Sequence, residues 1–175
     1  KPNLKGDHQL ENASTALAAA FILKNNGEKI NLKSLNQSIK KTKWPGRIEI
    51  FKYKNKNVIL DGSHNISGAE QLNIFLKTNK IKPIVIFGML NNKNIFKFLK
   101  TLKNSIDILF PIKIPKEKNS YTCQEIQNHA NKLKLPFNNI KNLKDIDKTI
   151  LSLPNKYILI TGSLYLVGKI RKKYL

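Results

Sequence analysis

The sequence predicts an α/β fold, a doubly wound and mostly parallel sheet with helices on both faces. Four short apolar runs alternate with helical patterns, and they occupy residues 58–60, 84–87, 106–110 and 157–160. Strands that are apolar along their whole length are typical of parallel sheets, in which both faces are covered. The length of 175 residues leaves room for one such domain and a smaller appendage.

Two helices are expected before this domain. Residues 9–23 carry apolar or small side chains at helical spacing, and an Asn-Asn-Gly sequence then supplies a stop. Residues 32–41 form a shorter amphipathic helix. Residues 41–46 have no periodicity and contain a Pro-Gly turn signal. We therefore expect a domain junction here, between a unit at 1–43 and a unit at 44–175.

From residue 47 the pattern changes to a hairpin and then to alternating helices and strands. Residues 47–53 alternate apolar and polar side chains, a Lys-Asn-Lys-Asn turn follows, and residues 58–60 form the second strand. The elements expected next are a helix at 68–78, a strand at 83–88, a helix at 95–103, a strand at 106–110, a helix at 123–133, a short strand at 137–140, a helix at 145–153, a strand at 157–160 and a helix from about 164.

Polar loops follow three of the predicted parallel strands, at residues 61–65, 88–91 and 161–163. Ligands of such sheets bind outside the carboxyl ends of the strands, so these loops are the predicted site and should share one edge of the sheet. A structural reading stays open beside the functional one. In it, Asp61 and Ser63 cap the following helix and Gly62 makes the turn.

The net charge of +21 leaves a nucleic-acid-binding module as an alternative, because clustered cations neutralise phosphates. Only two of the 32 basic residues are arginines, however, and the lysines are scattered among 22 asparagines along the chain. Phosphate- and base-reading surfaces favour the bidentate fork of arginine. The Lys and Asn excess is what an AT-rich genome would encode at tolerant surface positions, which we treat as a hypothesis. Against this background, Arg47 marks a position that needs a planar guanidinium.

Other chemistries find little support in the sequence. The single cysteine, Cys123, has no partner for an internal disulfide or a metal knuckle. The histidines His8, His64 and His129 have no metal-ligand spacing, so no metal site is predicted within this chain. Residues 162–169 superficially resemble a phosphate loop, but the spacing of the glycines is wrong and Ile170 replaces the required Ser or Thr.

No run approaches the roughly 18 apolar residues of a membrane span, and the first residues lack the apolar region of a signal peptide. We therefore expect a soluble, cytoplasmic protein with no membrane partner. We also expect it to be a monomer.

Motifs that stand in order along the chain carry a family resemblance. They are Gly-Asp-His-Gln-Leu-Glu-Asn at 6–12, Trp-Pro-Gly-Arg at 44–47, Leu-Asp-Gly-Ser-His-Asn at 60–65, Gly-Met-Leu at 88–90 and Thr-Gly-Ser-Leu-Tyr-Leu-Val-Gly at 161–168. This series resembles the C-terminal part of the dihydrofolate synthase/folylpolyglutamate synthase branch of the Mur ligase superfamily. The other Mur ligases, which build peptidoglycan peptides, share the fold and remain an alternative. The departures from the family pattern are Ser63 for the usual Ala, Ile66 for a frequent Pro, and Asn91-Asn92 where an acidic residue is common.

The resemblance implies a Rossmann-like Mur ligase C-terminal domain at 44–175, preceded by the helical tail of the central ATPase domain at 1–43. It also implies an ATP-dependent ligase of folate biosynthesis that joins glutamate to dihydropteroate or folate through an acyl phosphate, with magnesium as the metal.

By the same resemblance, the catalytic residues would be Asp61, His64 and Arg47. Asn12 would contact the nucleotide base, Arg47 the phosphates and Asp61 the ATP, with His64 orienting the nucleotide or the incoming substrate. Since these residues flank the junction, catalysis would require domain closure.

In this family the phosphate loop and most magnesium ligands belong to the N-terminal half, and the sequence holds no Gly-x-x-x-x-Gly-Lys-[Ser/Thr]. We therefore expect a C-terminal fragment that is inactive alone and that needs a P-loop half as its partner. A chain that folds without any activity is a further option. The sequence leaves open whether dihydropteroate, folate or both are substrates.

Overall fold

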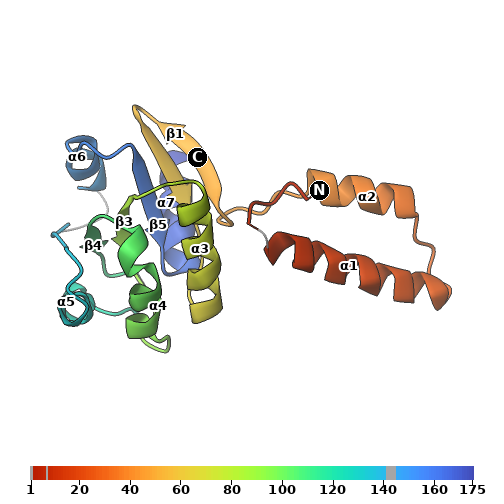
Figure 1. Cartoon of the computed structure of the whole chain (residues 1–175), viewed down its shortest axis with the longest axis horizontal. Coiled ribbons are helices and arrows are strands. Elements are labelled where there is room, and N and C mark those ends of the chain that lie inside the picture. The colour runs from red at the N-terminus through yellow and green to blue at the C-terminus, as the bar shows by residue number, and fades with distance from the viewer. Residues whose placement is uncertain (1, 7, 141–144) are drawn as a thin grey trace. The chain divides into compact units, whose positions relative to one another are not determined.

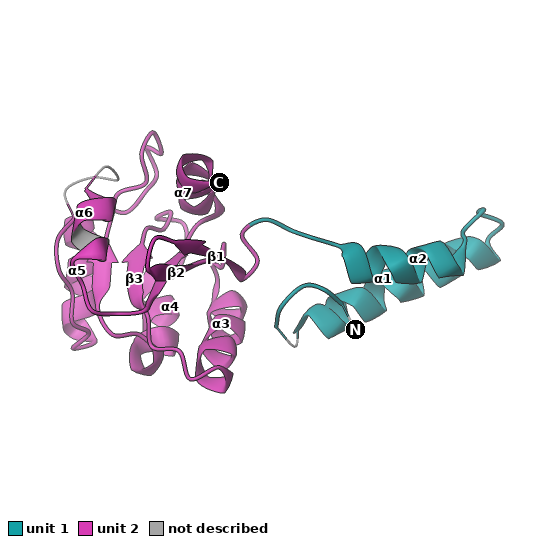
Figure 2. Ribbon diagram, turned by 90° about the horizontal axis from the view of Figure 1, so that it is seen from above, with its two compact units in different colours: residues 1–45 teal, residues 46–175 magenta. Residues whose placement is uncertain are grey.

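The computed structural model describes residues 2–6, 8–140 and 145–175 (Figure 1). The chain divides into two compact units, Lys1–Pro45 and Gly46–Leu175 (Figure 2). Asp7, within the first of the sequence motifs, lies outside the described residues.

The first unit consists of α1 (His8–Asn25) and α2 (Leu32–Lys41), which confirms the two predicted helices. The Asn31 side chain caps α2 by accepting hydrogen bonds from the backbone N–H of Lys33 and Ser34 at 2.9 and 3.2 Å. Of the described residues of this unit, Gln9 is buried and every other one is exposed or half-buried. The unit therefore has almost no core of its own.

The second unit is built on a mostly parallel sheet, as predicted. Its described strands are β1 (Glu49–Tyr53), β2 (Lys56–Leu60), β3 (Ile84–Phe87), β4 (Leu109–Pro111) and β5 (Tyr157–Thr161), in the spatial order β1-β2-β5-β3-β4. The hairpin strand β1 pairs antiparallel with β2, and all other pairs are parallel. Insertion of β5 between β2 and β3 brings the last strand of the chain to the centre of the sheet.

Helices cover both faces of the sheet (Figure 1). They are α3 (Ile66–Thr78), α4 (Ile95–Leu102) with a 3₁₀ turn at Lys103–Ser105, α5 (Cys123–Lys132), α6 (Ile146–Leu151) and α7 (Leu164–Tyr174). One core lies between the sheet and α3, α4 and α5, and the other lies between the sheet and α6 and α7. In β2, Ile59 enters the first core while Val58 and Leu60 enter the second. This alternation follows from the period of two along a strand.

The predicted short strand at 137–140 is wrong. Phe137 makes a single bridge to Leu109 at the edge of the sheet, and no strand is assigned in this segment, all of which the structure describes. The side chain of Asn138 accepts a hydrogen bond from the backbone N–H of Asn139 at 2.7 Å. Such local side-chain bonds compete with strand pairing, and asparagine has low strand propensity.

Candidate functional site

The loops that follow β2, β5 and β3 lie side by side at one edge of the sheet, as the sequence predicted. Backbone hydrogen bonds among the described residues join them: Gly62 N–H to Gly46 O at 2.7 Å, Gly162 N–H to Ser63 O at 3.1 Å, and Gly88 N–H to Thr161 O at 3.4 Å. Gly46 of the Trp-Pro-Gly-Arg motif therefore joins this cluster. The edge is a continuous backbone scaffold built from four separate parts of the sequence.

Gly162 is needed where two of these loops meet. Its φ is +101°, and a Cβ atom there would lie 2.6 Å from the carbonyl oxygen of Gly88 and 2.7 Å from Cε2 of Phe87. Real Cβ contacts essentially never come that close, and L side chains rarely adopt this φ. The close approach of the two loops therefore depends on glycine.

An open hollow of about 240 Å³ lies at this edge. It is lined by His64, Leu90, Asn92, Lys93 and residues 162–165. The lining contains the cation of Lys93 and no carboxylate. Helix α7 begins here, with the Ser163 hydroxyl accepting a hydrogen bond from the Tyr165 N–H at 3.1 Å. A positive helix N-terminus and an ammonium group both favour a negatively charged ligand.

Asp61 is buried, with 3% of its surface exposed, and both of its carboxylate oxygens are hydrogen-bonded. One oxygen accepts from the backbone N–H of Ser63 and the other from that of Ile48, each at 3.0 Å. The cap of α3 is Asn65, which accepts from the Gly68 N–H at 2.8 Å. The alternative in which Asp61 and Ser63 cap this helix is therefore wrong, because Asp61 instead links two loops.

His64 is half-buried and contributes to the wall of the hollow. Its Nδ1 lies 2.9 Å from the carbonyl oxygen of Gly62. A carbonyl only accepts hydrogen bonds, so this contact requires the proton on Nδ1. In the neutral ring, Nε2 is then a free acceptor.

Arg47 is half-buried, and its guanidinium has no hydrogen-bond partner among the residues that the structure describes. Its neighbours Gly46 and Ile48 both have positive φ values, of +72° and +50°. Because Ile48 is tied to Asp61, the structure brings Arg47 and Asp61 into one cluster. His64 joins them, since it lies three residues after Asp61 on the same loop.

Asn12 belongs to the first unit. It is exposed on α1, and its side-chain amide donates to Gln9 Oε1 at 3.1 Å.

The described residues contain no group of three or more His, Cys, Asp or Glu side chains that could hold a metal ion. The described residues therefore offer no set of magnesium ligands. No helix in the described part of the chain combines the length and apolarity needed to cross a membrane.

Comparison with known protein families decides the affiliation. The family described as "Dihydrofolate synthetase, C-terminal domain" matches residues 47–173. The chain belongs to this family. The resemblance seen in the ordered motifs is thus confirmed, and the matched range falls within the second unit.

Relatives of this dihydrofolate synthetase family member cover nearly the whole chain. The dihydrofolate synthase/folylpolyglutamate synthase of Bacillus subtilis is 33% identical over 184 residues, which span 99% of this chain and 40% of the relative. A folylpolyglutamate synthase structure from Thermotoga maritima is 30% identical with a TM-score of 0.71, over 99% of this chain and 40% of that one. E. coli FolC in complex with DHPP and ADP has the same fold, with a TM-score of 0.80, 24% identity and the same coverage. The chain therefore spans about 40% of the length of these relatives.

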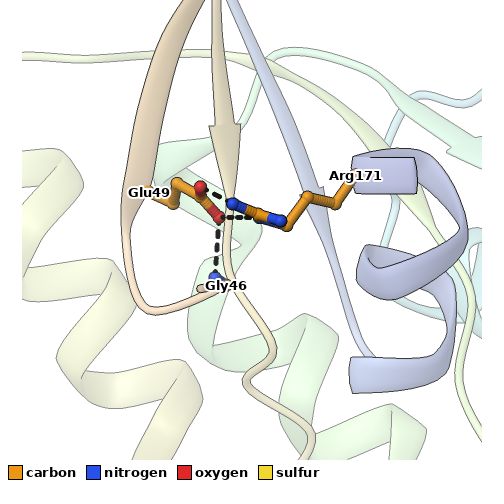
Figure 3. Close-up of polar contacts among 3 residues, drawn as sticks. All are labelled: Gly46, Glu49 and Arg171. Carbon is orange, nitrogen blue, oxygen red and sulfur yellow. Dashed lines mark hydrogen bonds and ion pairs between the residues drawn. The ribbon is translucent and has the colours of Figure 1, made fainter. Parts of the chain in front are cut away.

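The sequence did not lead us to predict two residues of this candidate site, Glu49 and Arg171 (Figure 3). The Arg171 Nε donates to both Glu49 oxygens, at 3.1 and 3.2 Å, and a Glu49 oxygen also accepts from the Gly46 N–H at 2.9 Å. The scarcity of arginine that drew attention to Arg47 applies equally to Arg171. It is the one sequence feature that could have identified Arg171 as a candidate.

Proposed function

We propose that this chain is the nucleotide-contacting C-terminal part of an ATP-dependent ligase that adds glutamate to dihydropteroate, to folate or to both. The observation that carries the proposal is the sheet-edge cluster. Arg47, unpaired among the described residues, is next to Ile48, which is hydrogen-bonded to Asp61, and His64 of the same loop lines the anion-favouring hollow. In the proposed reaction, ATP phosphorylates the acceptor carboxylate, the amine of glutamate attacks the acyl phosphate, and phosphate leaves.

Arg47 would bind the phosphates of the nucleotide. A guanidinium holds two phosphate oxygens at once, and negative charge develops on these oxygens during phosphoryl transfer. The lack of a protein partner for Arg47 among the described residues supports this role, because the group needs no rearrangement to receive a ligand. Asn12 would contact the base of the nucleotide from the first unit. E. coli FolC was captured with ADP, in accord with nucleotide use by the fold.

Asp61 would act in this conformation by positioning its neighbours. Its hydrogen bonds to the N–H groups of Ile48 and Ser63 fix the residues next to Arg47 and His64. A carboxylate can accept about four hydrogen bonds in total. Asp61 already accepts two, so a direct contact with a donor group of ATP would use one of the remaining positions.

The hollow would receive the incoming glutamate. Lys93 and the N-terminus of α7 favour the glutamate carboxylates. His64, with its proton on Nδ1, leaves Nε2 able to accept a hydrogen bond from the amine that attacks. The absence of acidic lining residues supports this assignment, since a carboxylate there would repel the substrate.

The first unit would be the helical tail of a central ATPase domain. Leu10, Phe21, Ile22 and Leu23 on α1 are between 43 and 62% exposed, although they are large and apolar. Isolated helix pairs with so little burial are marginally stable in water. Their exposure supports packing against further ATPase segments, which would also supply the P-loop and the magnesium ligands.

A chimera tests this function. The N-terminal part of the Bacillus subtilis relative, up to the position matching Lys1, is joined to residues 1–175. We expect ADP release that requires both glutamate and a pterin acceptor, and the choice of acceptor identifies the substrate. The 175-residue chain by itself should release no ADP. Glutamate-dependent ADP release by the isolated chain would contradict the proposal.

A nucleic-acid role predicts a different outcome. The isolated chain would then bind duplex DNA in a salt-sensitive manner, and the binding would survive replacement of both Arg47 and Asp61 by alanine. The proposed ligase function requires no binding to DNA.

A further inference from the structure

The ion pair between Glu49 and Arg171 is bound to Gly46, the residue before Arg47, and the proposed reaction does not use it directly. Glu49 is the first residue of β1, and Arg171 lies 122 residues later in the last turn of α7. Figure 3 shows the Arg171 side chain reaching from the helix to the Glu49 carboxylate, which also receives the Gly46 N–H. One carboxylate thus connects α7 to the residue that precedes Arg47.

We propose that Glu49 and Arg171 are positioning residues for Arg47. Glu49 fixes the backbone before Arg47, and Arg171 occupies the Glu49 carboxylate so that this group does not pair with the Arg47 guanidinium. The expected effect on nucleotide binding rests on the proposed function of Arg47. The expected effect on the hydrogen bonding of Arg47 does not.

The backbone on both sides of Arg47 is anchored by a carboxylate. On one side, the Gly46 N–H donates to Glu49 at 2.9 Å. On the other side, the Ile48 N–H donates to Asp61 at 3.0 Å. Gly46 is further enclosed, because a Cβ atom there would lie 2.9 Å from Cγ1 of Val167. The main chain is therefore fixed while the side chain of Arg47 stays available, which is the arrangement that preorganised charge stabilisation requires.

The charges explain why a cation is needed at position 171. Glu49 is two residues from Arg47, and a carboxylate binds any guanidinium within reach. Arg171 Nε already donates to both Glu49 oxygens. The side chains of Arg171 and Glu49 are 41% and 23% exposed, and ion pairs this accessible contribute little to stability. The pair is thus better explained by the competition it prevents than by the stability it adds.

NMR of the 175-residue chain provides the test, because its two arginines give two side-chain Nε–H signals. In Arg171→Gln, Glu49 should capture Arg47, so that exchange of the Arg47 Nε–H with water slows about tenfold. The double variant Arg171→Gln with Glu49→Gln should restore the fast exchange. Arg171→Lys keeps a cation beside Glu49 and should leave Arg47 as in the wild type. Lys172→Gln removes an exposed cation from the same helix and serves as the matched control, with no change expected.

Unchanged exchange of Arg47 in Arg171→Gln would overturn the proposal, as would failure of the double variant to restore it. If Arg171→Gln does not fold, the variants Arg171→Lys and Glu49→Gln still test the proposal. Slowed exchange of Arg47 in Arg171→Lys, or unaltered exchange of the Arg171 Nε–H in Glu49→Gln, would each contradict it.

Titration with ADP of the chimera, which holds the P-loop half, separates this inference from the proposed function, and Arg47→Lys identifies the Arg47 signal there. In the wild type, ADP should shift the Arg47 Nε–H signal, and Arg171→Gln should weaken ADP binding about tenfold. If ADP leaves the Arg47 signal unchanged while Arg171→Gln still slows its exchange, the nucleotide role fails and the positioning role stands. If ADP shifts the signal equally in both proteins and exchange is unaltered, the positioning role fails and the nucleotide role stands.

Discussion

The carboxylate of Asp61 accepts a hydrogen bond from the backbone N–H of Ile48 at 3.0 Å, and both residues are 3% exposed. Ile48 has a φ of +50°, a left-handed conformation that β-branched residues rarely adopt. The buried charge-assisted hydrogen bond offsets the cost of this conformation. A strained residue beside Arg47 is therefore held in place by the acidic residue of the Leu-Asp-Gly-Ser-His-Asn motif.

Replacing Asp61 by Asn tests this linkage. An amide has one oxygen, so one of the two buried N–H groups of Ile48 and Ser63 would lose its acceptor. We expect the free energy of unfolding to fall by about 2 kcal/mol, the usual cost of an unsatisfied buried donor. Urea denaturation followed by circular dichroism measures the change. Asp107→Asn, at an exposed carboxylate, is the matched control and should stay within about 0.5 kcal/mol of the wild type. Equal stability of the two variants would show that the Asp61 hydrogen bonds do not hold the loop.

Ligation in the chimera with the Bacillus subtilis N-terminal part should depend on Arg47 and Asp61. Arg47→Ala removes a proposed phosphate contact, and Asp61→Ala releases the segment that carries Arg47. Each should raise the activation barrier by about 2 to 4 kcal/mol, the scale for losing one positioned electrostatic contact. Glutamate-dependent ADP release under saturating ATP gives the measurement. Lys97→Ala, at an exposed position of α4, should turn over normally. Normal turnover of either site variant would remove that residue from the site.

The sequence predicted the sheet well because its parallel strands are almost entirely buried. The runs in β3 and β5 consist of large apolar residues with no polar interruption, and turn residues bound them closely. The shared sheet edge also followed, since parallel strands end on the same side. The strand predicted at 137–140 was wrong, because a short apolar stretch beside two asparagines does not by itself determine strand pairing.

Long-range contacts of the site could not be read from the sequence. The acceptor role of Asp61 depends on Ile48, thirteen residues away, and the alternative cap position at Asn65 has an equally suitable side chain. The Glu49 and Arg171 pair joins residues 122 positions apart. Periodicity reports burial along one element, whereas these contacts arise only when β1, the loop after β2 and α7 meet.

The contact of Tyr174 with Asp147 predicts a pH dependence of stability. Burial, followed by the hydrogen bond to Asp147, raises the pKa of Tyr174 from 10.0 to about 12. The folded state therefore resists loss of this proton, so the contribution is complete below pH 10 and is lost as the pH rises toward about 12. Many lysines also titrate in this range, and comparison with Tyr174→Phe cancels their effect. Between pH 10 and 12, we expect the free energy of unfolding of the wild type to fall further than that of Tyr174→Phe. Parallel declines would refute the linkage.

Two glycines near the site should respond to alanine in opposite directions. Gly162 has a φ of +101°, and an added Cβ would lie 2.6 Å from the Gly88 carbonyl oxygen. Gly162→Ala should therefore destabilise the protein by about 2 kcal/mol or more, because backbone strain and a clash with main chain act together. Gly168 lies inside α7, and an added Cβ meets nothing within 4 Å.

Gly168→Ala is thus the matched control for the same substitution, and it should stabilise the protein by about 0.5 to 1 kcal/mol through helix propensity. Urea denaturation of both variants gives the two changes. The NMR signals of His64 and Lys93, which line the hollow, should shift in Gly162→Ala and stay in place in Gly168→Ala. A neutral or stabilising Gly162→Ala would mean that the loops after β3 and β5 separate easily. The hollow would then be too deformable to hold a ligand in a fixed orientation.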